Sequence, residues 1–246
     1  MEYDNIRAII SLVLVLAISL FLYLFDKKGK EEEFDAEDKR RMRIRSMAFD
    51  AVIIALLFAM SFIPYVGFIN VGPFSLTLLH LPVLLGASLF GWKKGLLYGT
   101  VFGLLSWFRA LYGASSVFDV AFQKIYVAVP PRILFGLLIG VMSTFVMKIS
   151  RDRPRYIMLM ISCFVATCAH TVMVFLDLFL AESWVYGWLF SGNVAIEGTG
   201  ITILGFLGIG MVLEAILGAL LIPTLNGTLK RAVPSLKQIG NRANPA

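Results

Sequence analysis

The sequence predicts an all-α membrane protein, a polytopic helical bundle that crosses the bilayer several times. Of its 246 residues, 59% are hydrophobic and only 15% are charged, and the mean hydropathy is +0.82. A soluble domain carries a charged fraction nearer a quarter. Several apolar runs reach the ~18–20 residues that a helix needs to cross a bilayer. The net charge of +6 therefore indicates basic cytoplasmic loops rather than nucleic-acid binding.

Seven apolar spans follow one another along the chain. They cover about 8–25, 47–63, 74–90, 95–111, 127–147, 156–181 and 203–229. No small-residue cleavage site follows the first span, so we interpret it as a retained transmembrane helix rather than a signal peptide. Pro64 ends the second span, and Pro130-Pro131 unwind or kink the start of the fifth.

The expected organisation is an extra N-terminal transmembrane helix (1–25), a charged cytoplasmic linker that is helical in part (26–46), a six-helix membrane domain (47–230) and a cytoplasmic tail (231–246). With the linker in the cytoplasm, alternation places 18 of the 22 Lys and Arg residues on that side. Such an asymmetry predicts a multi-pass cell-membrane protein with its N-terminus outside and its C-terminus in the cytoplasm. The outer loops are rich in Gly, Ser, Asn and aromatic residues, which favours an outward-facing surface for a small solute.

Small residues recur at every fourth position in two spans. Gly91, Gly95, Gly99 and Gly103 form one series, and Ala51, Ala55 and Ala59 form another. Small residues let helix backbones approach closely in lipid, where no hydrophobic force drives helices together. We expect tight helix packing at the glycines. The alanines suit either internal packing or the docking of a partner membrane protein.

Ionisable and polar residues at membrane depth are the candidate site residues, because they are costly there unless they have a function or a partner. Arg109 suits either snorkelling to the headgroups or binding of a carboxylate. His80 and His170 suit interhelical hydrogen bonding or, for His170 with Thr171, a polar ligand. The remaining candidates have structural interpretations: Arg132 bonds carbonyls freed by the prolines or an acid, Asp177 pairs with Arg132 or Arg109, and Glu214 bonds a neighbouring helix.

Motifs for catalysis, nucleotide hydrolysis and metal binding are absent from the sequence. It contains no GxxxxGK[ST], HExxH or GxSxG motif and no carboxylate pair at catalytic spacing. Its two cysteines, Cys163 and Cys168, lie in one apolar run and do not form a CxxC pair. The sequence therefore predicts neither an enzyme nor a cofactor or metal site.

Two blocks carry a family resemblance. They are TLLHLPVLLGASLFGWKKGLLYGTVFGLLSWFRA (77–110) and AVPPRILFGLLIG (128–140). Over residues 47–230 the chain resembles the substrate-binding S components of energy-coupling factor (ECF) transporters. The Ala51, Ala55, Ala59 series is similar to the AxxxA motif of their first core helix. The N-terminal helix 8–25 lies outside the family pattern.

The resemblance implies a six-helix S-component core that binds a vitamin at its outer side and does not hydrolyse ATP. It implies two kinds of partner, a transmembrane coupling protein and two ABC-type ATPases, with the alanine stripe as the docking surface. It also implies that 64–73 forms a lid over the ligand, which makes Asn70 a candidate contact.

Among the S components, the chain most resembles pantothenate-type members. Thr77 and Arg109 match positions of that group, and His170-Thr171 stand where those members have Asn-Thr. The resemblance implies substrate contacts from Asn70, Thr77, Arg109, His170 and Thr171, with Arg109 on the carboxylate. Two alternatives stay open: a flavin or other vitamin stacked on aromatic side chains such as Trp107, and a stand-alone secondary carrier that uses Asp177 or Glu214.

Overall fold

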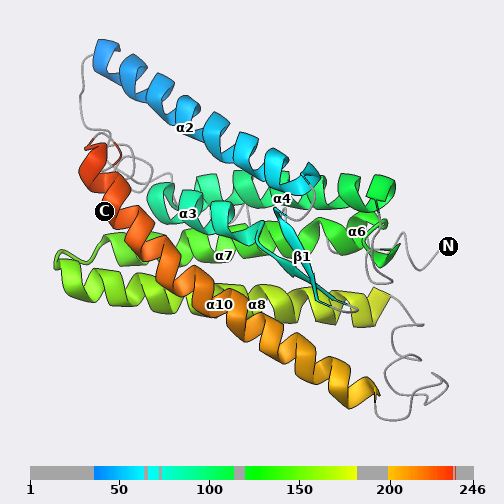
Figure 1. Ribbon diagram of the computed structural model, residues 1–246. Helices are drawn as coiled ribbons and strands as arrows, with labels where there is room; N and C mark the ends of the chain where they lie inside the picture. Colours follow the sequence, from blue (N-terminus) through cyan, green and yellow to red (C-terminus); the bar gives the residue numbers. More distant parts are fainter. Residues whose placement is uncertain are drawn as a thin grey trace.

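The computed structural model is a bundle of long helices with one small hairpin (Figure 1). It describes residues 36–63, 66–71, 74–113, 120–181, 199–234 and 236. The helices are α2 (Ala36–Phe62), α3 (His80–Phe90), α4 (Trp92–Gly113), α6 (Ile125–Ala128), α7 (Pro130–Met147), α8 (Asp152–Ala181) and α10 (Thr199–Ala232), and the strands are β1 (Phe68–Val71) and β2 (Phe74–Thr77). The expected first span, 8–25, lies outside the described residues.

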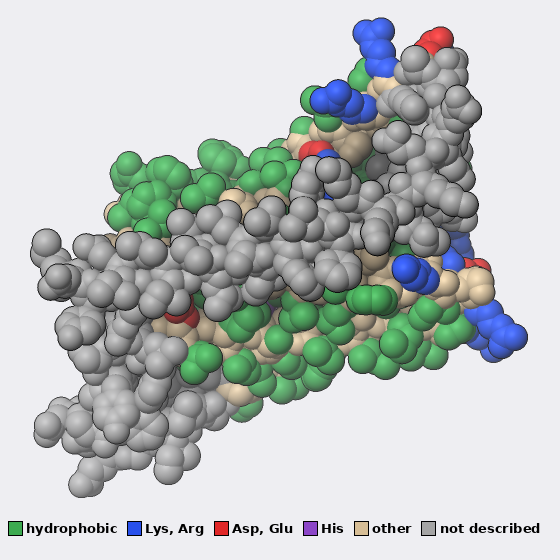
Figure 2. Space-filling view, turned by 180° about the vertical axis from the view of Figure 1, so that it is seen from behind, with side chains coloured by type: hydrophobic (Ala, Val, Ile, Leu, Met, Phe, Trp, Pro, Cys, Tyr) green, Lys and Arg blue, Asp and Glu red, His purple; other side chains and the backbone are tan. Residues whose placement is uncertain are grey.

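Within the described residues, four helical segments are long and apolar enough to cross a bilayer: Arg40–Phe62, Ile125–Met147, Asp152–Leu178 and Gly208–Ala232. Large apolar side chains such as Phe145, Leu176 and Leu220 are exposed on the outside of the bundle. Figure 2 shows hydrophobic side chains over much of the described surface, with Lys and Arg gathered towards the end where α2 begins. A surface of this kind is suited to lipid, and it confirms the expectation of a helical membrane bundle.

Helix α2 begins earlier than the expected second span. It starts at Ala36 rather than near residue 47, so the part of the charged linker that the structure describes is helical. Its sequence is rich in Glu, Lys, Arg, Ala and Met, which are good helix formers. The Arg41 guanidinium also forms an ion pair with Glu37 one turn earlier, at 2.6 Å.

The third expected span, 74–90, is wrong in its first part. Residues 74–77 form β2, which pairs antiparallel with β1, and the helix begins only at His80. Aromatic and apolar residues on both sides of Gly72-Pro73 favour such a hairpin. The 11 residues of α3 rise about 16 Å, roughly half of the bilayer core. Gly91 ends α3 with a φ of 78°, a conformation that favours glycine, and α4 follows at once.

The glycine series lies in the contact between α4 and α7. A Cβ on Gly95 would fall on the carbonyl oxygen of Gly136, and one on Gly99 would lie 2.5 Å from the carbonyl oxygen of Arg132. A Cβ on Gly103 would lie 3.0 Å from the Cα of Val129. The two antiparallel backbones therefore touch along three turns, which confirms the predicted role of the glycines in tight packing.

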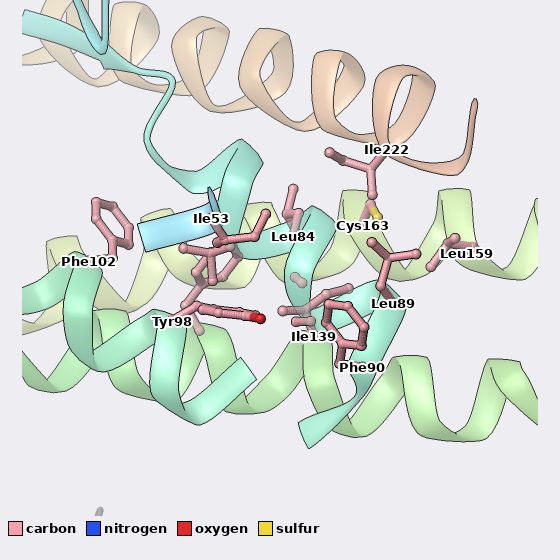
Figure 3. Packing of buried hydrophobic residues seen from close by; sticks show 14 of the residues in the cluster. Ile53, Leu84, Leu89, Phe90, Tyr98, Phe102, Ile139, Leu159, Cys163 and Ile222 are labelled. Atoms are coloured by element: carbon pink, nitrogen blue, oxygen red, sulfur yellow. The ribbon is translucent and has the colours of Figure 1, made fainter. Parts of the chain in front are cut away.

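The apolar core lies between α2, α3, α4, α7, α8 and α10. Figure 3 shows side chains of this core, including Ile53 from α2, Leu84 from α3 and Cys163 from α8. Tyr98 is fully buried, and a Cβ on Gly86 would lie 2.6 Å from Cδ2 of its ring. The tyrosine therefore fills a gap in α3 that only glycine leaves open.

A polar clamp ties the start of the apolar part of α2 to α4. The Asp50 carboxylate accepts hydrogen bonds from the Lys94 ammonium and from the Tyr98 hydroxyl, the latter at 2.6 Å. The side chains of Lys94 and Asp50 are only 26% and 14% exposed, so the pair is largely desolvated. Removing one member of such a pair leaves the other charge without compensation.

We expect Asp50→Asn to lower the free energy of unfolding by about 1–3 kcal/mol, because Lys94 then lacks an anionic partner. Thermal unfolding of the purified protein in detergent measures the change. Arg41→Ala, which removes an exposed ion pair on the same helix, is the matched control and should have little effect. Equal unfolding temperatures for Asp50→Asn and the wild type would show that the clamp does not hold α2.

Candidate functional site

Polar side chains from two helices, α7 and α8, converge inside the bundle around two phenylalanine rings. His170 of α8 lies with its ring centroid 4.6 Å from that of Phe135 on α7 and 5.8 Å from that of Phe102 on α4. The guanidinium of Arg132 lies 5.9 Å from the Phe102 ring. His170 and Arg132 are each only 6% exposed. The apolar interior thus contains an enclosed polar cluster.

Arg132 owes its position to the two prolines that precede it. In a continuous helix the Val127 carbonyl would accept from residue 131, but Pro131 has no N–H. The Arg132 Nη1 donates to this carbonyl instead, at 3.2 Å, which confirms the predicted role in bonding freed carbonyls. Its guanidinium also stacks 4.4 Å from the centroid of the Phe122 ring.

One further ionisable side chain, Asp177, follows His170 along α8. Asp177 lies seven residues after His170, on the same face of α8 and two turns further along. Asp177 is half-buried, and its Oδ2 has no hydrogen-bond partner among the described residues. Its pairing with Arg132 or Arg109 stays a prediction.

The hairpin is joined to the bundle through the backbone of Thr77. Its N–H donates to the Glu214 carboxylate on α10, at 2.5 Å, and its carbonyl oxygen lies 2.5 Å from Nδ1 of His80. Glu214 therefore bonds the end of β2, and the interpretation that it bonds a neighbouring helix is wrong. Both the N–H and the carbonyl of Thr77 are hydrogen-bonded, so the base of the hairpin is held against α3 and α10.

The structure brings only some of the predicted contacts together. His170 lies between the Phe102 and Phe135 rings, whereas Thr77 contacts His80 through its backbone carbonyl. Thr171 is half-buried, and its hydroxyl donates to the Thr167 carbonyl of its own helix at 3.3 Å. Asn70 pairs with Ser75 in the hairpin.

Arg109 stands apart from the buried cluster along α4. It is half-buried and lies seven residues after Phe102, on the same face of the helix and about 10 Å further along its axis. The end of α4 is fixed nearby, because Trp107 Nε1 donates to the Gln123 carbonyl at 2.9 Å and Gln123 Nε2 donates to the Ala110 carbonyl at 3.1 Å. An arginine therefore stands between the buried cluster and one end of the bundle.

The alanine stripe faces away from the bundle. Ile53 and Leu57 mark the buried face of α2, whereas Ala51 and Ala55 are exposed and Ala59 is half-buried. On a helical wheel Ala55 lies about 160° from Leu57. Ala51 and Ala55 therefore do not pack against the described part of this chain, whereas Ala59 is partly covered by it.

The substrate contacts predicted from the sequence did not include His80, Arg132, Asp177 or Glu214. Each had one detectable signal, an ionisable side chain within an apolar span. That signal does not reveal which of them meet, since they come from four different helices. Among the described residues, no group of three His, Cys, Asp or Glu side chains is placed to hold a metal ion.

The fold and the cluster define a class of protein: a multi-spanning membrane protein with an enclosed polar site between its helices. A family model described as "ECF transporter, substrate-specific component" matches residues 43–226, and the chain belongs to this family. It is therefore a membrane transport component and not an enzyme, as its sequence predicts.

Two relatives of this chain are named as transporters. The chain is 33% identical over 167 residues to "Pantothenic acid transporter PanT" of Lactococcus lactis subsp. cremoris. The aligned region covers 60% of this chain and 81% of that protein. It is 28% identical over 102 residues to "Pantothenate transporter PanT" of Leuconostoc mesenteroides subsp. mesenteroides. Here the aligned region covers 40% of this chain and 50% of that protein.

Proposed function

We propose that this protein is the substrate-binding subunit of an ATP-driven ECF importer and that its substrate is pantothenate. The observation that carries the substrate assignment is the similarity to two relatives named as pantothenate transporters. The side chains of the bundle support this assignment. They offer arginines for the carboxylate of pantothenate, polar groups for its hydroxyls and amide, and aromatic rings for its apolar part. In this proposal a six-helix S-component core (47–230) follows an extra N-terminal helix and a charged linker.

The ligand lies between Arg109 and the buried cluster. Arg109 binds the carboxylate, because a guanidinium matches a carboxylate with two parallel hydrogen bonds. His170, Thr77 and Thr171 contact the polar groups deeper in the bundle, and Asn70 contacts the ligand from the hairpin that serves as a lid. The lid faces the outside of the cell, and the lysine-rich ends of the helices face the cytoplasm.

The partners in this proposal are a transmembrane coupling protein and two ABC-type ATPases. The Ala51, Ala55, Ala59 stripe, which is exposed at its first two positions, docks on the coupling protein, since small residues allow a partner helix to approach closely. The chain itself has no P-loop, so the energy of ATP reaches it only through these partners.

Isothermal titration calorimetry of the purified protein tests the substrate assignment. We expect pantothenate to bind with high affinity and riboflavin not to bind. A yellow chromophore that copurifies with the protein, or binding of another vitamin but not of pantothenate, would contradict the assignment.

We expect Arg109→Gln to weaken pantothenate binding about 10- to 100-fold, because charge-assisted hydrogen bonds contribute about 1.5–3 kcal/mol. Pantothenol, which has a hydroxyl in place of the carboxylate, provides the matched ligand. The substitution should change its affinity little. An equal loss of affinity for both ligands would mean that Arg109 acts on the structure of the site and not on the carboxylate.

A further inference from the structure

His80 has one ring nitrogen engaged and the other directed into the bundle. The side chain is 1% exposed, and Nδ1 lies 2.5 Å from the Thr77 carbonyl oxygen. A carbonyl oxygen only accepts, so Nδ1 carries the hydrogen, and in the neutral ring Nε2 presents a lone pair. This Nε2 is buried and has no hydrogen-bond partner within the described part of the chain. A buried acceptor of this kind costs free energy unless a donor reaches it.

A second acceptor lies beside it. A Cβ placed on Gly218 of α10 would lie 3.0 Å from Leu84 Cδ1, 3.6 Å from Thr167 Oγ1 and 3.9 Å from His80 Nε2, so all three atoms lie near the same point of the α10 backbone. The Thr167 hydroxyl donates to the Cys163 carbonyl at 2.9 Å, which leaves its oxygen with lone pairs only. Both polar atoms at this point therefore accept hydrogen bonds, and no side chain of residue 218 stands between them.

This acceptor pair adjoins the polar cluster. Thr167 lies one turn before His170 on the same face of α8. The group that complements these two acceptors is a hydrogen-bond donor, such as a hydroxyl.

We infer that a hydroxyl group of the transported solute donates a hydrogen bond to His80 Nε2, with Thr167 Oγ1 as an alternative acceptor for the same proton. The inference rests on the proposed function, and it assigns the hydroxyl end of the solute to the deep side of the site, away from Arg109. The same ring bonds the base of the hairpin through Thr77. A hydroxyl that donates to Nε2 polarises the ring and strengthens this bond, so His80 connects recognition of the ligand to the lid.

Calorimetric titrations with three ligands test the inference: pantothenate and two analogues in which one or the other hydroxyl is replaced by hydrogen. We expect the wild type to bind one of the two deoxy analogues about 10- to 100-fold more weakly than pantothenate, since the two acceptors are then left unpaired. In His80→Phe this discrimination should disappear, with pantothenate binding about as weakly as the analogue.

Two further variants make the test independent of the folding of His80→Phe. Thr167→Val conserves the shape of the side chain and removes one acceptor, so it should lose part of the discrimination. Ser143→Ala is the matched control, because Ser143 on α7 is also buried with a hydroxyl that has no partner among the described residues. It should discriminate as the wild type does.

The outcomes separate the inference from the proposed function. If the wild type binds pantothenate and both analogues equally well, or if His80→Phe and Thr167→Val keep the full discrimination, the inference is wrong and the assignment of pantothenate stands. If the folded wild type binds none of the three ligands, the proposed substrate and the inference are both wrong.

Discussion

Ala55→Trp is expected to abolish uptake of the substrate and to leave its binding unchanged. Ala55 is exposed on the side of α2 that faces away from the core, and the Asp50 clamp holds the start of this segment on α4. A large side chain here meets nothing inside the chain, but it prevents a partner helix from approaching closely. Overpacking of a helix contact costs about 1–3 kcal/mol, which corresponds to a loss of roughly tenfold or more in association.

The measurement compares binding by calorimetry with uptake of radiolabelled substrate in cells that contain the coupling module. Val165→Trp is the matched control, because Val165 is an apolar residue on α8 that is 44% exposed and is not part of the alanine stripe. It should support normal uptake. Equal losses of binding and uptake in Ala55→Trp would show that the stripe serves the fold rather than docking.

Gly136→Leu is expected to prevent folding of the bundle. A Cβ at this position would fall on the Gly95 carbonyl oxygen and lie 2.9 Å from the Cα of Gly99. These are backbone atoms of α4, and they cannot move aside as a side chain can. The substitution therefore separates the two helices, and we expect it to cost about 3 kcal/mol or more, at or above the upper end of overpacking in protein cores.

The yield of monodisperse protein in detergent and its thermal unfolding measure this effect. Gly227→Leu on α10 is the matched control, because nothing lies within 4 Å of a Cβ built there. A bundle that tolerated Gly136→Leu as well as Gly227→Leu would not depend on close contact between α4 and α7.

The parts of the fold that depend on local pattern were predictable. The glycines of α4 recur at intervals of four, so one face of a helix and its close contact follow directly from the sequence. The long apolar runs likewise predict α7, α8 and α10. The hairpin was not predictable in the same way, because its strands, FINV and FSLT, have only four residues each. The second strand also ends three residues before α3, so it looks like the start of that apolar span.

The candidate site was predictable only residue by residue. Each ionisable side chain in an apolar run is visible in the sequence, but Thr77 and Glu214 are 137 residues apart and meet only through the packing of α10 on the hairpin. The role of Arg132 was an exception. Its bond to the Val127 carbonyl follows from the missing N–H of Pro131, which is a local effect.

Uptake of radiolabelled pantothenate into proteoliposomes, with and without the coupling protein and its two ATPases, tests the central claim most directly. We predict uptake that requires both the module and ATP, and binding without uptake when the protein is present alone. Accumulation of pantothenate by the protein alone would contradict the account, because the chain would then be a self-sufficient carrier.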